Sequence, residues 1–167
     1  MLLKFSVIPF LLVNLAITCF ELKQIERSHR LALQALNEAR EHGEPYIETA
    51  SLLNLGQIAI LRGDAAAAWD LLRPAIRMAH ASDDPSSLAA ALTVAGDWVL
   101  AAGDRMAALR LWDFVARHPQ VEESERAAAR RRLAAQAITE PLALEGLPSP
   151  TSFDAVIDHL FARFDAA

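Results

Sequence analysis

The chain has 167 residues, which is enough for one domain of ordinary size or a short series of repeats, but too few for two domains. It contains 33 alanines and 25 leucines, whereas the aromatic residues make up only 7%, and this composition excludes a fold dominated by β-sheet. The net charge of -5 argues against a general nucleic-acid-binding surface, and the single cysteine excludes an internal disulfide framework and a multi-thiolate metal site.

The first element is an apolar run over residues 5–20 that follows Lys4. Its length of about 16 residues is short of the roughly 20 that span a membrane, and taken alone the run has the character of a signal-peptide core. The alternative is a helix of the fold itself, because Leu12 in the run is matched by Leu52 forty residues further on. We therefore expect a cytoplasmic protein, with export or membrane anchoring through residues 5–20 as the alternative.

A period of forty residues runs through the chain, and such self-similarity is typical of repeat architectures. Gly56 and Gly63 recur as Gly96 and Gly103, and an aspartate follows the second glycine of each pair. The same offset relates Leu52 to Leu92, Ala67 to Ala107, Ala68 to Ala108, Leu71 to Leu111 and Arg77 to Arg117. It also relates Leu12, Asn14, Leu15, Leu31, Ala35, Ala39 and Pro45 to Leu52, Asn54, Leu55, Leu71, Ala75, Ala79 and Pro85. These matches predict three units, over about 5–44, 45–84 and 85–120.

Each unit is predicted to be a helical hairpin. Apolar residues recur at three- and four-residue steps over 52–60 and again over 65–81, and Gly63 with Asp64 interrupts the pattern where a C-cap glycine and an N-cap aspartate belong. Leu72 is expected to fill the seam between the two helices of its unit. Because one hairpin cannot bury its apolar face alone, neighbouring units are expected to stack.

The small, large and turn positions of these units resemble the tetratricopeptide repeat (TPR) pattern. The positions that carry the resemblance are Leu52-Leu55-Gly56-Ala59 with Ala68-Leu72-Ala75, and Leu92-Ala95-Gly96-Val99 with Ala108-Trp112-Val115. The segment 107–135 also resembles the repeat regions of large bacterial signalling and transcriptional regulators. The resemblance implies an all-α fold, namely a right-handed α-α superhelix (a TPR-like solenoid) of about three helical hairpins plus C-terminal helices.

The resemblance also implies a binding surface, because the first helix of each unit lines a concave groove in TPR-like solenoids. Its outward positions in this chain are Val13, Ile17, Phe20, Leu53, Gln57, Ile60, Thr93, Asp97 and Leu100. This mostly apolar lining suits an amphipathic helix or an extended apolar peptide. Alternatively, the C-terminal helix covers some of these positions. Trp112 is expected in the core, and a half-exposed position at the edge of the groove is one alternative for Trp98.

The C-terminal part contains three further segments. Residues 121–138 are expected to form a charged helix that closes a repeat domain of residues 1–139. Residues 140–150 include three prolines and are expected to be a linker. Residues 151–167 have the pattern of an amphipathic helix, which either folds back on the repeats or docks into another molecule.

The N-terminal hairpin lacks the polar outer face that terminal repeats normally have. Val7, Phe10 and Leu11 are expected to leave apolar surface open. We therefore expect a neighbour supplied by a partner or by a second copy, as in a homodimer formed through the uncapped N-terminal hairpin.

The chemistry-bearing residues do not form a recognisable site. The five histidines include no pair at i, i+4, Cys19 lacks an identifiable base, and neither a phosphate-binding loop nor a serine-centred elbow occurs. We expect no catalysis, no metal, no small-molecule cofactor and no direct contact with nucleic acid. The expected function is that of a protein- or peptide-binding scaffold or adaptor. The alternatives are a sensing or oligomerisation fragment of a bacterial regulator, and a membrane- or envelope-anchored TPR protein.

Overall fold

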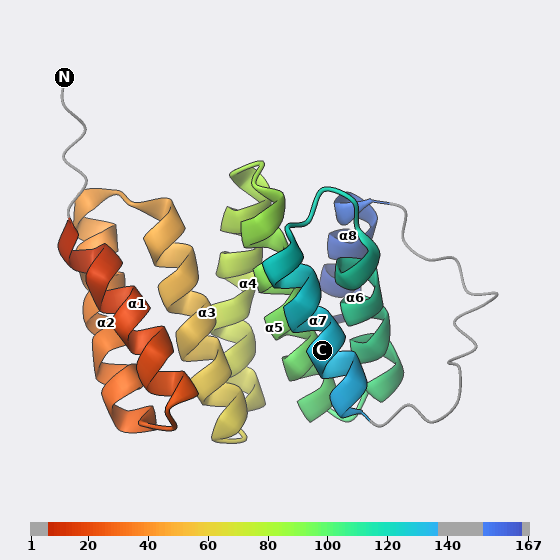
Figure 1. The fold of residues 1–167 in the computed structure, drawn as a ribbon, viewed down its shortest axis with the longest axis horizontal. Coiled ribbons are helices and arrows are strands. Elements are labelled where there is room, and N and C mark those ends of the chain that lie inside the picture. Colours follow the sequence, from red (N-terminus) through yellow and green to blue (C-terminus); the bar gives the residue numbers. More distant parts are fainter. Residues whose placement is uncertain (1–6, 137–151, 165–167) are drawn as a thin grey trace.

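The computed structural model describes residues 7–136 and 152–164, and this part of the chain is helical without any strand (Figure 1). The helices are α1 (Val7–Glu21), α2 (Ile25–His42), α3 (Pro45–Leu61), α4 (Ala65–Ala81), α5 (Pro85–Ala101), α6 (Arg105–Arg117), α7 (Glu123–Ala135) and α8 (Phe153–Phe164). The all-α class that the resemblance implies is confirmed. Residues 137–138 of the expected closing helix, the expected linker 140–150, Thr151 and residues 165–167 lie outside the described residues.

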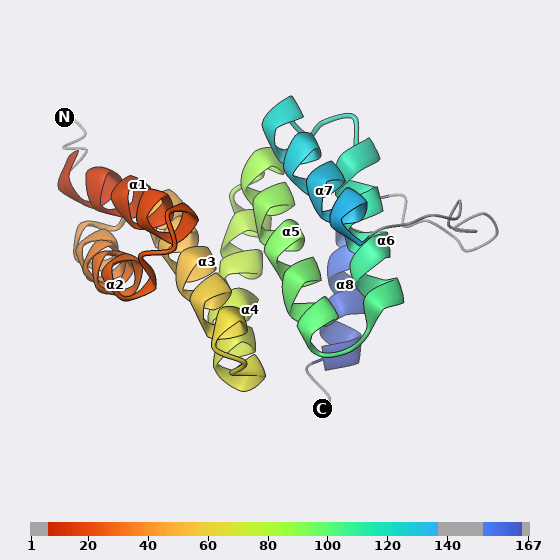
Figure 2. The same cartoon turned by 60° about the horizontal axis from the view of Figure 1, so that its bottom comes forward.

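Consecutive helices pack as hairpins, α1 with α2, α3 with α4 and α5 with α6 (Figure 1). The helices α1, α3, α5 and α7 lie next to one another in one layer, and α2, α4, α6 and α8 form the opposite layer (Figure 2). The forty-residue period reappears in where the helices start, at 25, 65 and 105 for α2, α4 and α6, and at 45 and 85 for α3 and α5.

The turns inside the second and third hairpins have the predicted chemistry. Gly63 and Gly103 adopt left-handed φ values of 76° and 91°, which glycine tolerates because it lacks a Cβ. Asp64 and Asp104 then cap α4 and α6, each accepting a hydrogen bond of 3.0 Å from a backbone N–H three residues ahead. In the first hairpin Lys23 takes the left-handed position, with φ 62°, in place of glycine.

The seam of each later hairpin holds a glycine opposite a large side chain. A Cβ built on Gly56 would lie 2.8 Å from Leu72 Cδ2, and one on Gly96 would lie 2.8 Å from Trp112 Cδ1. Leu72 and Trp112 are fully buried, which confirms their expected core positions. The Trp112 indole N–H donates to the Thr93 carbonyl at 3.0 Å, so its polar group is satisfied inside the core.

The last helix folds back on α4, α5 and α6. Ser152 Oγ accepts a hydrogen bond from the Ala155 N–H at its start, and the side chains of Val156, Ile157 and Leu160 are buried. Ion pairs connect α8 to the rest of the fold at both ends, His80 with Asp154, 3.3 Å apart, and Asp104 with Arg163. Of the two alternatives for this helix, the structure has the folded-back one.

An aromatic cluster lies under the C-terminal end of α8. The rings of Trp69 and Trp98 stack with centroids 4.7 Å apart, and Phe164 meets Trp98 edge-on at 4.7 Å. The Trp98 indole N–H donates to the Ala65 carbonyl at 2.8 Å, and the residue is only 7% exposed. The half-exposed alternative for Trp98 is therefore not the one that the structure has, because its ring packs toward α4 and Phe164 covers it.

Candidate functional site

The nine residues predicted to line a groove all belong to the layer of first helices, but they differ in exposure. Val13, Leu53 and Thr93 are buried, at 2%, 8% and 4% exposed. Val13 packs against α2 and α3 residues in a small core cluster, and the Thr93 hydroxyl donates to the Ala89 carbonyl of its own helix at 2.7 Å. These positions point inward because the first helices contact each other within the layer. The half-buried or exposed members of the set are Ile17, Phe20, Gln57, Ile60, Asp97 and Leu100.

Asp97 is engaged inside the chain. Arg132 of α7 forms a bidentate ion pair with its carboxylate, with N–O distances of 2.6 and 2.8 Å. Burial raises the pKa of the Asp97 carboxyl, and the hydrogen bonds and charge of Arg132 oppose that shift. Asp97 therefore links α5 to α7, and both of its carboxylate oxygens are engaged by Arg132.

A cavity opens instead at the end of the layer where α3, α5 and α7 begin. It has a volume of about 330 Å³ and contains only Leu53 of the nine predicted residues. Its lining consists of Tyr46, Thr49, Ala50, Leu53, Asp84, Ser86, Ser87, Ala90, Glu122 and Glu125. We call it the acidic pocket. Because α3, α5 and α7 all start at this end, the residues that precede and open them gather along one edge (Figure 1).

The acidic pocket combines an apolar floor with negative charge. Leu53, Ala50 and Ala90 supply aliphatic surface, and the Tyr46 ring stands 63% exposed beside them. Asp84, Glu122 and Glu125 supply carboxylates, and within the described residues none of them forms an ion pair with a lysine or arginine. Negative charge beside aliphatic surface suits a cationic group carried on an apolar stem.

Asp84 is held ionised by its local structure. Its carboxylate accepts hydrogen bonds from the Ser87 hydroxyl at 2.5 Å and from the backbone N–H groups of Ser86 and Ser87 at 3.1 and 3.2 Å. The Ser87 hydroxyl makes the largest contribution to lowering the pKa of Asp84, and the two N–H groups of the α5 N-terminus add to it. The pocket therefore keeps this negative charge at neutral pH.

The sequence analysis missed the acidic pocket although a signal for it exists. Acidic residues stand at the N-cap positions of α3, α5 and α7, namely Glu44, Asp84 and Glu122. Asp84 is explained as a helix cap, because its carboxylate accepts from the first N–H groups of α5, whereas Glu44 and Glu122 make no capping hydrogen bond with their side chains. Only the parallel placement of the first helices shows that their charges share one edge.

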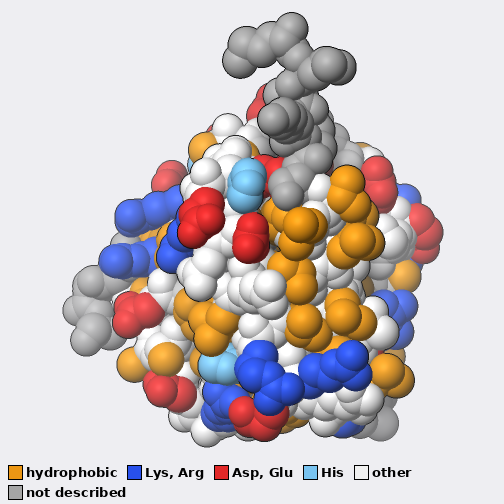
Figure 3. Space-filling model, turned by 90° about the vertical axis from the view of Figure 1, so that its left-hand side faces the viewer, with side chains coloured by type: hydrophobic (Ala, Val, Ile, Leu, Met, Phe, Trp, Pro, Cys, Tyr) orange, Lys and Arg blue, Asp and Glu red, His pale blue; other side chains and the backbone are white. Residues whose placement is uncertain are grey.

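The outer surface of α1 is a second unusual feature. Its exposed apolar residues are Val7, Ile8, Phe10, Leu11, Leu15, Ile17 and Leu22, which are 37–64% exposed. We call this surface the α1 apolar face. In Figure 3 apolar side chains gather at this end of the molecule, with charged side chains around them. The exposure expected for Val7, Phe10 and Leu11 is confirmed.

Within residues 7–136 and 152–164, no helix has the length and apolar character to cross a membrane. The same residues include no group of three acidic, histidine or cysteine side chains placed to hold a metal ion. In comparisons of the whole chain, no protein-family model, curated protein or solved structure matches it.

Proposed function

We propose that the protein is a non-catalytic scaffold that binds a peptide segment of another protein along its layer of first helices, as a TPR-like right-handed superhelix does. The observation that carries the proposal is the acidic pocket, a cavity of about 330 Å³ with three carboxylates beside an aliphatic floor. Pockets of this size with a few polar groups that converge on an apolar floor are typical of ligand sites.

The pocket defines the chemistry of the peptide. An aliphatic side chain would pack on Leu53 and against the Tyr46 ring, and a neighbouring lysine, arginine or chain N-terminus would meet Asp84, Glu122 and Glu125. Lysine and arginine also bury their alkyl stems on such apolar surface while the charged group stays at the rim. We therefore propose a peptide with a basic group next to an aliphatic residue. The apolar or amphipathic segment expected from sequence is thereby narrowed to one that carries a basic group.

Selection from a displayed library of random peptides tests this proposal. Peptides enriched on the wild-type chain should carry lysine or arginine beside an aliphatic residue and should lose at least tenfold in affinity for Tyr46→Ala and for the double variant E122Q/E125Q. Met106→Ala and Glu41→Gln remove comparable exposed groups elsewhere and should bind as the wild type does. Enrichment of acidic peptides, or of peptides that bind the pocket variants unchanged, would refute the proposal.

A second candidate function, self-association, is favoured by the α1 apolar face. Its seven apolar side chains are 37–64% exposed, and a standard interface takes ~800 Å² from each partner. An interface between two copies through the same face would bury this area without burying a charge, because its apolar residues carry none. Such a dimer would support the alternative function, that of an oligomerisation fragment of a bacterial regulator.

Light scattering after size-exclusion chromatography tests the second candidate. We expect a dimer that Leu11→Glu converts to a monomer, whereas Leu61→Glu, at an equally exposed leucine of α3, should remain dimeric. A wild-type chain that is monomeric at 100 micromolar, or a dimer unchanged by Leu11→Glu, would refute it.

A further inference from the structure

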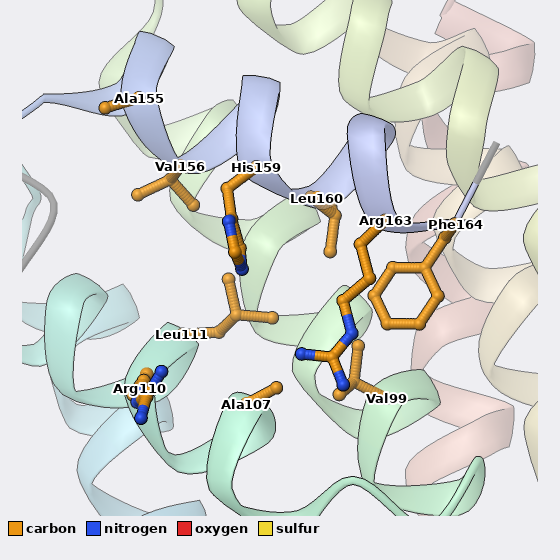
Figure 4. Close-up of a pocket in the computed structure, with 10 residues that line it drawn as sticks. All are labelled: Val99, Ala107, Arg110, Leu111, Ala155, Val156, His159, Leu160, Arg163 and Phe164. Carbon is orange, nitrogen blue, oxygen red and sulfur yellow. The ribbon is translucent and has the colours of Figure 1, made fainter. Parts of the chain in front are cut away.

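A second cavity lies in the opposite layer, between α8, α6 and the end of α5. Its volume is about 340 Å³, and its lining comprises Val99, Ala107, Arg110, Leu111, Ala155, Val156, His159, Leu160, Arg163 and Phe164. We call it the α8 cavity. Figure 4 shows side chains of α8 pointing across the space toward Leu111 and Ala107 of α6 and Val99 of α5.

The inner wall of the α8 cavity is apolar. Val99, Leu111, Val156 and Leu160 lie at its base and are at most 9% exposed, and the half-buried Ala107 and Phe164 add more accessible apolar surface. Ala107 of α6 presents only a small side chain to this space, whereas Leu111 of the same helix and Leu160 of α8 are larger. A void with this lining binds an apolar group well, since only apolar contacts are gained and no polar group loses water.

The mouth of the same cavity is cationic. Arg110, His159 and Arg163 are exposed side chains that line it. Arg163 pairs with Asp104, whereas Arg110 and His159 make no hydrogen bond or ion pair within the described residues. An anion placed here would find the Arg110 guanidinium, with five N–H donors, unengaged.

We propose that the α8 cavity is a binding site for a small amphipathic anion, specifically a medium-chain alkyl carboxylate. The alkyl chain lies against Leu111, Ala107 and Phe164, and the carboxylate accepts hydrogen bonds from Arg110 at the mouth. A volume of about 340 Å³ is at the lower end of the range for small-molecule sites, which favours a medium chain over a long one.

Binding at this site has a consequence for the fold. The α8 cavity has α8 as one wall and α5 with α6 as the other, so an occupant contacts both. A ligand that binds only the docked form stabilises it by mass action. The carboxylate therefore acts as an effector that stabilises the docked position of α8 against α5 and α6. The proposal is independent of the peptide-binding function, because the acidic pocket lies between helices of the first-helix layer.

Calorimetric titration of the full chain with octanoate, decanoate and dodecanoate tests the proposal. We expect saturable binding with one site per chain, and binding of decanol, which has the same chain without the charge, on the order of tenfold weaker. Arg110→Ala should weaken decanoate binding on the order of tenfold and leave decanol unchanged. Ala155→Phe, at an exposed position of the rim, should block both ligands.

Arg131→Ala is the matched control, because Arg131 is an exposed arginine of α7 that does not line the cavity. It should bind decanoate as the wild type does, and near-ultraviolet circular dichroism should show all variants folded. Hydrogen exchange supplies a second measurement, in which decanoate slows exchange in α8 of the wild type but not of Arg110→Ala at the same concentration.

Three results would overturn the proposal. One is no saturable binding of any of the three carboxylates at millimolar concentration. Another is equal affinity of wild type and Arg110→Ala for decanoate. The third is binding to vesicles of anionic phospholipid without binding of free decanoate, which would assign the cationic mouth to a membrane surface.

Discussion

Replacing Gly96 with alanine should destabilise the protein even though it puts a better helix former inside α5. The new Cβ would lie 2.8 Å from Cδ1 and 2.9 Å from Cε2 of Trp112 and still nearer to the indole nitrogen, closer than real Cβ atoms approach other atoms. Trp112 is 1% exposed and surrounded by core side chains, so its ring moves only if the hairpin opens.

The magnitude follows from three contributions. Alanine gains about 0.5–1 kcal/mol over glycine in a helix interior. Overpacking costs about 1–3 kcal/mol, and displacing the buried indole N–H from the Thr93 carbonyl costs about 1–3 kcal/mol more. We expect a net loss of about 3 kcal/mol in the free energy of unfolding. At Gly56 the nearest atoms, 2.8 and 3.1 Å away, belong to the flexible Leu72 side chain, so Gly56→Ala should stay within about 1 kcal/mol of wild type.

Urea denaturation followed by far-ultraviolet circular dichroism measures both variants. The double variant Gly96→Ala/Trp112→Leu isolates the cause, because with a smaller side chain opposite, the alanine should no longer be unfavourable relative to Trp112→Leu alone. The reasoning fails if Gly96→Ala is as stable as the wild type, or if the two changes destabilise additively.

Three further predictions concern contacts of α5, α7 and α8. Asp97→Arg places two guanidinium groups together, so it should lower the free energy of unfolding by about 2 kcal/mol and speed hydrogen exchange in α7. The exchanged pair Asp97→Arg/Arg132→Asp should recover most of this loss. No recovery would show that the ion pair is not the cause. Asp84→Ala should cost about 1 kcal/mol at pH 7. The folded-state pKa of Asp84 lies below its ordinary 3.8, so the stability that its carboxylate contributes is complete above pH 3.8 and is lost as the pH falls through the folded value. If Asp84→Ala remains equally destabilised in strong acid, the ionised carboxylate is not the cause. Phe164→Ala removes the ring that covers Trp98. Thermolysin should then cleave α8 at least tenfold faster, with little change in the unfolding of the other helices. Equal cleavage rates of the variant and the wild type would contradict this packing.

The helical hairpins could be predicted from sequence because their signals are local. Gly63 followed by Asp64 both ends one helix and starts the next, and the hydrogen bond from the Ala67 N–H to Asp64 is what that pair of residues predicts. The close approach at Gly56 and Leu72 likewise follows from a glycine set opposite a large side chain at fixed spacing. These features depend on residues of one unit alone.

The exposure of the candidate site residues could not be predicted in the same way, because it depends on contacts between units. Asp97 has the position of a ligand-contacting residue within its own unit, but Arg132, which engages it, lies 35 residues further along the chain. Leu53 and Thr93 became buried because α3 and α5 pack directly against each other. The period of the sequence predicts which residues are equivalent, whereas the packing between units decides which equivalents remain exposed.

The two layers differ in how closely their helices pack, and this difference determines where α8 lies. The helices α3 and α5 are in direct contact, whereas the side chains of α8 reach α4 through Trp69 and α6 through Phe114. Large aromatic residues at both contacts give α8 apolar surface to bury between the second helices. The described residues of α8 therefore leave the acidic pocket open, and a peptide bound there and a small anion held under α8 would occupy opposite layers of the same chain.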